Sequence, residues 1–169
     1  MPKVAAIVAL LALVAPEAKK QHIDLYLVDA LVTHESEWNP RAINPTSGAL
    51  GLGQHLPSTL PACRHDLTSE ACSAAQARLL DGPYNLRLTV KALGGLRRWC
   101  KQRTGRTPTE AGLLMAYGGY NRLKQGQLCG LRKDKRGRWR PVPIPGQVKE
   151  ILDLKRSRAR LFKVSRPRH

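Results

Sequence analysis

Apolar residues recur at helical spacing over residues 21–35, where Ile23, Leu27 and Leu31 form one stripe with further apolar residues beside it. Because residues three and four positions apart line one face of a helix, this pattern predicts a helix that ends near Glu35. The predicted helix therefore carries a carboxyl group at the end of an apolar face.

Three later segments also show helical patterns. Residues 84–102 carry an apolar stripe with basic residues elsewhere, and residues 56–82 are typical of short helices. A third helix is expected to begin after Thr107 or Thr109 and to run to Tyr117. The sequence shows no strand-like alternation of any length and no internal repeat, so it predicts a mainly α fold.

Residues 39–54 follow the first of these helices and are crowded with turn residues. Pro40 disfavours helix for the residue before it, and Gly48, Gly51 and Gly53 lie in one loop. Since glycine adopts backbone conformations that other residues avoid, we expect an unusual backbone path here that lets the loop approach a ligand closely.

The amino-terminal segment is apolar without interruption from Val4 to Ala15 and is preceded by Lys3. This pattern predicts a secretory signal peptide over residues 1–18, with cleavage after Ala15 or Ala18, and export to the periplasm or cell envelope. Twelve helical residues rise about 18 Å, which is short of the ~30 Å hydrocarbon core, so a membrane span is disfavoured. The alternative is a buried first helix.

Four cysteines, an even number, favour two disulfides in an exported protein, and three pairings are possible. The short loop favours Cys63 with Cys72, which leaves Cys100 with Cys129. Free core thiols are the alternative if the protein is not exported. A zinc site is disfavoured because the cysteines and histidines lack ligand spacing, and we expect no metal and no cofactor.

The length of 169 residues suits one compact domain with appendages. Twenty-nine Lys and Arg against 12 Asp and Glu give a net charge of +17, which predicts attraction to a polyanion. Residues 130–169 hold 14 basic and three acidic residues, a net of +11. A basic C-terminal tail is therefore expected over residues 131–169, with an extended proline-rich connector and a short amphipathic helix.

Glu35 is the best candidate for acid chemistry. Cleavage of a glycosidic bond needs a carboxylic acid that stays protonated near neutral pH, and the apolar helical turn before Glu35, with Trp38 after it, should raise its pKa by desolvation. Glu37 is expected to point away, since two helical positions differ by about 200°. Asp66 and Asp81 are the other acids that could act as partners, although both are more typical of helix ends or loops.

Three stretches of the chain carry spaced motifs. They are Glu35-Ser36 with Trp38-Asn39-Pro40-Arg41-Ala42 and Ser47-Gly48-Ala49-Leu50-Gly51-Leu52-Gly53-Gln54; Asn85-Leu86; and Ala116-Tyr117-Gly118-Gly119-Tyr120-Asn121. These resemble the motifs E-S-x-aromatic-x-P-x-A with S-x-x-G-A-x-G-L-M-Q, N-I and A-Y-N-x-G of the lytic transglycosylase (soluble lytic transglycosylase-like) family. The resemblance covers about residues 22–122.

The resemblance implies a lysozyme-like, mainly α domain over residues 19–130 that cleaves the β-1,4 bond between N-acetylmuramic acid and N-acetylglucosamine. The matching Glu35 would act first as general acid and then as general base, which leaves a 1,6-anhydro end. The family's motifs further imply roles around the substrate for Gln54, Tyr117, Ser36, Trp38 and Asn121: Gln54 would bind the sugar, Tyr117 would orient the acid, and Ser36 and Trp38 would support the site.

Three positions depart from the family pattern. Gly53 stands where the family has Met, and Gly118 stands where it has Asn, with Asn121 three residues later. The glycine expected midway along the middle helix is absent, and Thr89 is nearest. Trp38 and Tyr117 also have a simpler interpretation, because aromatic residues beside apolar helices often only fill the core.

Two other functions are compatible with the sequence. One is a hydrolytic muramidase, such as a goose-type-like lysozyme, on the same fold. The other is a non-catalytic binding module, since Arg132–Arg140 places Trp139 among basic residues, as nucleic-acid-binding segments do. Export disfavours nucleic acid, and an anionic envelope surface explains the charge equally well. The expected partners are peptidoglycan glycan strands and, as a possibility, secretion, conjugation or phage machinery.

Overall fold

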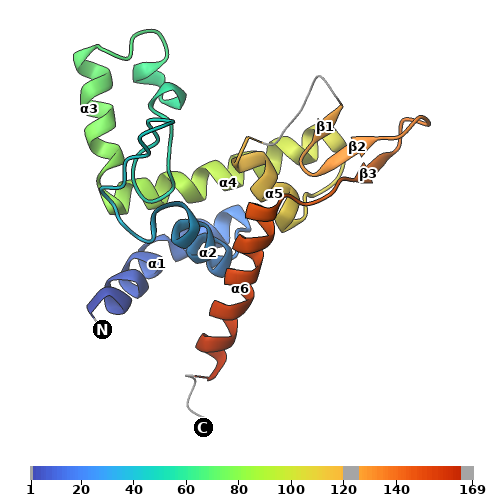
Figure 1. Cartoon of the computed structure of the whole chain (residues 1–169), viewed down its shortest axis with the longest axis horizontal. Coiled ribbons are helices and arrows are strands. Elements are labelled where there is room, and N and C mark those ends of the chain that lie inside the picture. The colour runs from blue at the N-terminus through green and yellow to red at the C-terminus, as the bar shows by residue number, and fades with distance from the viewer. Residues whose placement is uncertain (1, 120–125, 165–169) are drawn as a thin grey trace.

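The computed structural model describes residues 2–119 and 126–164. Helices dominate these residues, so the mainly α fold class is confirmed. Figure 1 shows the arrangement of its elements: α1 (Pro2–Gln21), α2 (Leu25–Ser36), two short 3₁₀ turns at Pro57–Thr59 and Pro61–Cys63, α3 (Glu70–Leu79), α4 (Gly82–Thr104), α5 (Glu110–Tyr117), β1 (Gln127–Leu128), β2 (Leu131–Lys133), β3 (Trp139–Pro141) and α6 (Gly146–Val164).

Side-chain caps explain where four helices begin. Asp24, Ser69, Asp81 and Thr109 each have extended backbone, and each accepts a hydrogen bond from a backbone N–H in the first turn of the helix that follows. Such a cap satisfies one of the N–H groups that the helix itself leaves unpaired. Thr109, rather than Thr107, therefore caps α5.

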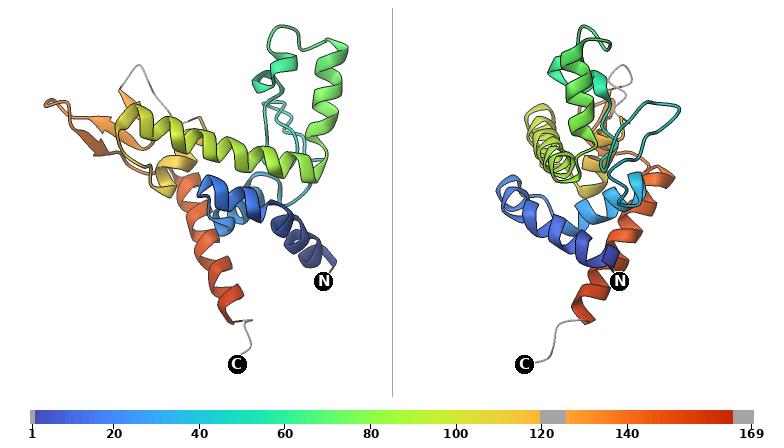
Figure 2. Two further views of the ribbon diagram at one scale, coloured as in Figure 1. Left: turned by 180° about the vertical axis from the view of Figure 1, so that it is seen from behind. Right: turned by 90° about the vertical axis from the view of Figure 1, so that its left-hand side faces the viewer.

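The long helix α4 runs across the molecule, with α3 on one side of it and α1, α2 and α6 on the other, as the left view of Figure 2 shows. Its apolar stripe is fully buried at Leu86, Val90 and Leu93. These residues belong to one core cluster with the buried faces of α2 and α5, including Leu31 and Met115. The predicted amphipathic helices thus meet in a single core, and the end of α2 is held against it.

Helix α1 combines buried and exposed apolar residues. Val14 and Ala18 in its second half are fully buried, whereas Val4 and Val8 in the first half are 60% and 46% exposed. Helix α1 packs mainly against α4. No helix within the described residues is both long enough and apolar enough to cross a membrane.

The two predicted disulfides are confirmed. Cys63 pairs with Cys72 across nine residues, and Cys100 pairs with Cys129 across 29. The first connects a short 3₁₀ turn to α3, in a small cluster that includes Leu50 of the loop over residues 39–54, here called the glycine-rich loop. The second ties the end of α4 to the turn between β1 and β2.

A three-stranded antiparallel sheet in the order β1-β2-β3 differs from the sequence-based expectation of no strands. Strands of two or three residues are too short to show an alternating pattern, which is why the sequence does not reveal them. The expected boundary at residue 131 falls inside this sheet. Within the basic segment, Asp134 forms ion pairs with Arg138 and Arg140, and the Lys133 ammonium lies over the Trp139 ring.

Helix α6 lies where the sequence predicts a connector and a short helix in a basic tail. The helix is present and packs along α2. Val148 and Ile151 are 1% and 4% exposed and belong to the main core cluster. The Lys155 ammonium forms ion pairs with Asp24 and Glu110. The first part of α6 is therefore an integral part of the folded domain and not an appendage.

Candidate active site

Glu35 lies in the last turn of α2, immediately before an abrupt change of chain direction. Glu37 and Trp38 follow with φ values of 51° and 63°, in the left-handed region that residues with side chains rarely adopt. Two such residues in succession cost about 1–2 kcal/mol each, so the surrounding packing must hold them in place. This turn ends α2 with Glu35 facing three adjoining cavities.

The surroundings of Glu35 favour its protonated form. Burial raises the pKa of the Glu35 carboxyl above its ordinary value, and the neighbouring His34 lowers it by a smaller amount. Desolvation raises the pKa of an acid because the charged form loses its hydration. Glu35 therefore combines partial burial with access to a cavity, as a general acid requires.

Ser36 and Trp38 fix the turn that follows Glu35. The Ser36 hydroxyl lies 2.9 Å from the carbonyl oxygen of Leu52, which joins the end of α2 to the glycine-rich loop. The Trp38 indole N–H lies 3.0 Å from Asp29 Oδ1 and 3.1 Å from Thr33 Oγ1, and the ring is only 7% exposed. Ser36 lines one of the three cavities together with Glu35, whereas Trp38 lines none of them and supports the turn from the core.

Asn85 organises the glycine-rich loop from beneath. Its Oδ1 accepts a hydrogen bond from the Gly53 N–H at 2.8 Å, and its Nδ2 donates to the carbonyl oxygens of Leu50 and Leu79 at 3.1 and 2.7 Å. Gly51 has a φ of 74°, and a Cβ there would overlap the Asn85 amide. The sequence identifies Asn85 only as a motif position, while the structure shows that this fully buried side chain holds the loop.

Gln54 lies in the cavity that the glycine-rich loop forms beside Glu35. Its φ is 51°, and its side-chain Nε2 donates to the carbonyl oxygen of Gly51 at 3.0 Å. This glycine-loop cavity has a volume of about 430 Å³ and is lined by His34, Glu35, Asn44, Ser47, Ala49, Gln54, Leu56, Tyr117, Gly118 and Gly119. Gln54 and Glu35 therefore face one space, as the resemblance implies.

Tyr117 lines two of the cavities together with Glu35. Its hydroxyl donates a 2.6 Å hydrogen bond to the carbonyl oxygen of Gly53, which links α5 to the glycine-rich loop. Burial raises the pKa of the Tyr117 hydroxyl, which keeps it protonated and able to donate. Tyr117 thus holds the glycine-rich loop against α5 at the edge of the site.

Gly53 and Thr89, two departures from the family pattern, occupy one space. A Cβ at residue 53 would overlap the Thr89 hydroxyl and would lie 2.8 Å from Tyr117 Oη. The Thr89 side chain, fully buried in α4, fills the volume that a larger residue at position 53 would need. The two departures are therefore complementary, and they keep the loop close to α4.

His55 lies beside the site residue Tyr117 but lines none of the three cavities, and the sequence does not identify it. Its Nε2 lies 3.0 Å from Thr89 Oγ1, and its ring lies edge-on to Tyr117 with centroids 6.1 Å apart. Burial lowers the pKa of His55 to about 4, so the ring is neutral at neutral pH. In the sequence, only the position of His55 directly after Gln54 points to a role near the site. Its contact with Thr89 cannot be read from the sequence, because the two residues are 34 positions apart.

The other acids considered from the sequence lie elsewhere or are exposed. Glu37 is the C-cap of α2 with a left-handed backbone, so its side-chain direction does not follow from helical rotation, as the sequence-based expectation assumes. It is exposed and lines a third cavity beside Glu35. Asp66 accepts hydrogen bonds from Thr68 in an exposed loop. Asp81 caps α4. Both are turn or helix-end residues.

Two further expectations concern Asn121 and metals. Asn121 lies outside the described residues, so its predicted substrate contact stays a prediction. No group of three or more His, Cys, Asp or Glu side chains among residues 2–119 and 126–164 is arranged to hold a metal ion.

Comparison with known proteins gives one result that bears on this site. The family model described as "Transglycosylase SLT domain" matches residues 12–127. None of the curated proteins compared with the chain matches it. The matched segment begins within α1, contains Glu35, the glycine-rich loop and Tyr117, and ends at the first strand.

Proposed function

The chain belongs to the family of transglycosylase SLT domains, which cleave glycosidic bonds of peptidoglycan, and on this premise we propose that Glu35 is its catalytic acid and base. The bond cleaved would be the β-1,4 bond between N-acetylmuramic acid and N-acetylglucosamine. The observation that carries the proposal is the position of Glu35, a partly buried carboxyl of raised pKa that faces cavities on more than one side.

In the first step, the protonated Glu35 carboxyl donates its proton to the glycosidic oxygen as the bond from that oxygen to C1 of the muramic residue breaks. The substrate's own acetamido group stabilises the positive charge that develops at C1. In the second step, the Glu35 carboxylate takes the proton of the C6 hydroxyl, whose oxygen forms the new bond to C1. The product is a 1,6-anhydro end, Glu35 is protonated again, and no water is consumed.

The scarcity of carboxylates beside Glu35 supports intramolecular closure over hydrolysis. A retaining glycosidase places two carboxyl groups about 5–5.5 Å apart, and an inverting one about 6.5–9.5 Å apart. Among the described residues that line the three cavities, Glu37 is the only other acid, and it is exposed beyond the end of α2. A hydrolytic muramidase on the same fold is the outcome that product analysis would reveal.

Export to the periplasm or cell envelope is part of the proposal, because the substrate is found there and residues 4–15 are apolar without interruption. Either cleavage would remove the buried Val14, and cleavage after Ala18 would remove the buried Ala18 as well. The intact mass of the exported protein tests this: a mature chain that begins at residue 16 or 19 supports export with cleavage, and a retained Met1 contradicts it.

The direct test of the catalytic role compares Glu35→Gln with Glu37→Gln on purified peptidoglycan. Glu35→Gln keeps the shape of the side chain but cannot exchange a proton, so we expect release of soluble fragments to fall by about 10²–10⁴-fold. Glu37→Gln makes the same chemical change at an exposed position two residues away, and release should stay within about twofold, since surface substitutions have small effects. Equal release by wild type and Glu35→Gln would refute the assignment.

A further inference from the structure

Two of the cavities that share Glu35 are formed by different parts of the chain. The glycine-loop cavity takes residues from the loop, as described above. The second, of about 210 Å³, is lined by Leu31, His34, Glu35, Leu114, Tyr117, Gly118, Gln147, Val148 and Ile151, so α6 supplies one of its walls. We refer to it as the α6 cavity. Glu35, His34, Tyr117 and Gly118 line both cavities, so the two spaces meet at the acid.

The chemistry of glycosidic cleavage requires two spaces of this kind. The glycosidic bond joins two sugar units. When the acid protonates the bridging oxygen, one sugar unit must therefore lie on each side of the acid. The glycine-loop cavity can take one unit. The α6 cavity combines apolar side chains, which suit the flat face of a sugar ring, with the polar Gln147 and His34, which suit its hydroxyl and acetamido groups.

Helix α6 is fixed firmly enough to act as a binding wall. Val148 and Ile151 anchor its first turns in the core, and the Lys155 ammonium connects it to Asp24 of the α2 cap and Glu110 of α5. Gln147, one residue before the buried Val148, is exposed on the cavity side. The family match ends at residue 127, so this wall lies outside the matched segment.

From this geometry we propose that the α6 cavity is a saccharide subsite, with Gln147 as a substrate-contacting residue that sets how tightly the glycan strand is held. The inference rests on the proposed function, since it places the second sugar beside the acid assigned there. The occupant is one unit of the glycan strand itself and not its stem peptide. At about 210 Å³ the cavity is smaller than the ~300–1,000 Å³ of sites for drug-sized ligands, which suits a single unit.

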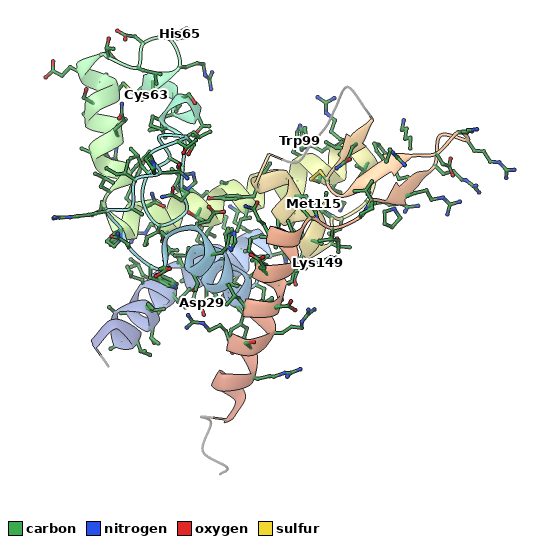
Figure 3. All side chains as sticks on the ribbon, in the orientation of Figure 1. Asp29, Cys63, His65, Trp99, Met115 and Lys149 are labelled. Atoms are coloured by element: carbon green, nitrogen blue, oxygen red, sulfur yellow. A yellow bond between two sulfur atoms is a disulfide. The ribbon has the colours of Figure 1, made fainter. Side chains whose placement is uncertain are left out.

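The test fills the cavity and leaves the acid chemistry out of the measurement. In the Glu35→Gln background, Gln147→Trp places a large ring at the cavity mouth, and Lys149→Trp places the same ring two residues along α6 at an exposed position that does not line the cavity. Figure 3 labels Lys149 on the first part of α6. The ligand is a peptide-free tetrasaccharide of alternating N-acetylglucosamine and N-acetylmuramic acid, and its Kd is measured by calorimetry.

We expect Gln147→Trp to raise the Kd about tenfold or more, which corresponds to about 1.4 kcal/mol, while Lys149→Trp leaves it unchanged. In the active protein, Gln147→Trp should raise KM for peptide-free glycan strands, with equal thermal midpoints for the two Trp variants as the check on folding. Equal Kd values for both variants would overturn the proposal. A loss seen only with peptide-bearing ligand would overturn it too, since the cavity would then hold the stem peptide.

The outcome also separates this inference from the proposed function. If wild type releases fragments, Glu35→Gln does not, and the two Trp variants bind equally, only the α6 subsite is wrong. If wild type neither binds the tetrasaccharide nor cleaves peptidoglycan, the proposed function fails, and the subsite fails with it.

Discussion

Gly53 and Thr89 both depart from the family pattern, and the two departures compensate for each other in volume. Thr89 donates to the carbonyl oxygen of Asn85 and contacts His55, while the absence of a side chain at Gly53 makes room for it. Sequence motifs treat the two positions separately, because they lie 36 residues apart. In the folded protein the two positions share one buried volume, which a side chain from either position can fill.

Substitutions at these two positions should therefore be strongly coupled. We expect Gly53→Ala to lower the free energy of unfolding by about 1–3 kcal/mol through overpacking, and Thr89→Ala in the same chain to restore part of that loss. Gly95→Ala, in α4 with no atom within 4 Å of the added Cβ, is the matched control and should change stability by under about 1 kcal/mol. Urea unfolding measures these three variants and Thr89→Ala alone, and additive losses in the double variant would refute the shared volume.

His55 should make stability depend on pH. Its pKa is about 4 in the folded protein and near 6.5 in the unfolded chain, so the unfolded state binds the proton more readily. The stabilisation is fully present above pH 6.5 and is lost as the pH falls towards 4, by about 2–3 kcal/mol relative to His55→Gln. Glu35 changes in the opposite sense, since its pKa is raised, and the comparison with His55→Gln cancels that contribution.

The measurement is urea unfolding of wild type and His55→Gln at pH 7 and at pH 4. Wild type should lose more stability than the variant over this interval. Equal losses for the two proteins would show that His55 is not held in its neutral form by the fold.

Helix α6 is held to α2 by an ion pair between Arg158 and the buried Asp29. Asp29 of α2 is fully buried, and its Oδ2 has no hydrogen-bond partner in the part of the chain that the structure describes. Arg158 Nε lies 3.7 Å from that oxygen, while the same side chain donates to Thr33 Oγ1 at 3.3 Å. Figure 3 labels Asp29 on α2 close to α6. Since a buried carboxylate without a counter-charge is costly, docking of α6 stabilises α2 as well.

Arg158→Met should therefore lower the free energy of unfolding by about 1–3 kcal/mol, because the Asp29 carboxylate would stay buried and lose its cation. Arg156 lies two residues before Arg158 on the same helix and forms an exposed ion pair with Asp153. Arg156→Met should therefore lower the free energy of unfolding by under about 1 kcal/mol. Asp29→Asn combined with Arg158→Met removes both charges and should recover most of the loss. Equal thermal midpoints for Arg158→Met and Arg156→Met would contradict this role of Asp29.

Local patterns account for the parts of the structure that the sequence predicts well. Helix α2 with Glu35 at its end, the Thr109 cap and the pairing of Cys63 with Cys72 depend on residues within about ten positions of each other. The hydrogen bonds of Asn85 with Gly53 and Leu50 connect residues 32 and 35 positions apart, and the contact of Arg158 with Thr33 connects residues 125 positions apart. No periodicity records such contacts, so the sequence does not predict them.

The whole molecule explains why the basic carboxyl-terminal region is not a free tail. A net charge of +11 over residues 130–169 predicts an appendage, yet the sheet and α6 fold residues 131–164 onto the domain. Most of the basic side chains described in this region are exposed, while Val148 and Ile151 enter the core. Basic residues of β2, β3 and α6 are thus carried by a folded surface, which can attract an anionic polymer while α6 also lines the site.

The central claim is that this folded unit brings one partly buried carboxyl, Glu35, to a glycosidic bond, and that the C6 hydroxyl of the muramic residue then bonds to C1 to give a 1,6-anhydro end. It is tested most directly by mass spectrometry of the muropeptides that wild type releases from peptidoglycan in ¹⁸O-labelled water. The account predicts products that are one water lighter than reducing-end muropeptides and that carry no ¹⁸O at the cleaved end. Reducing ends that contain ¹⁸O would contradict it and would identify a hydrolase.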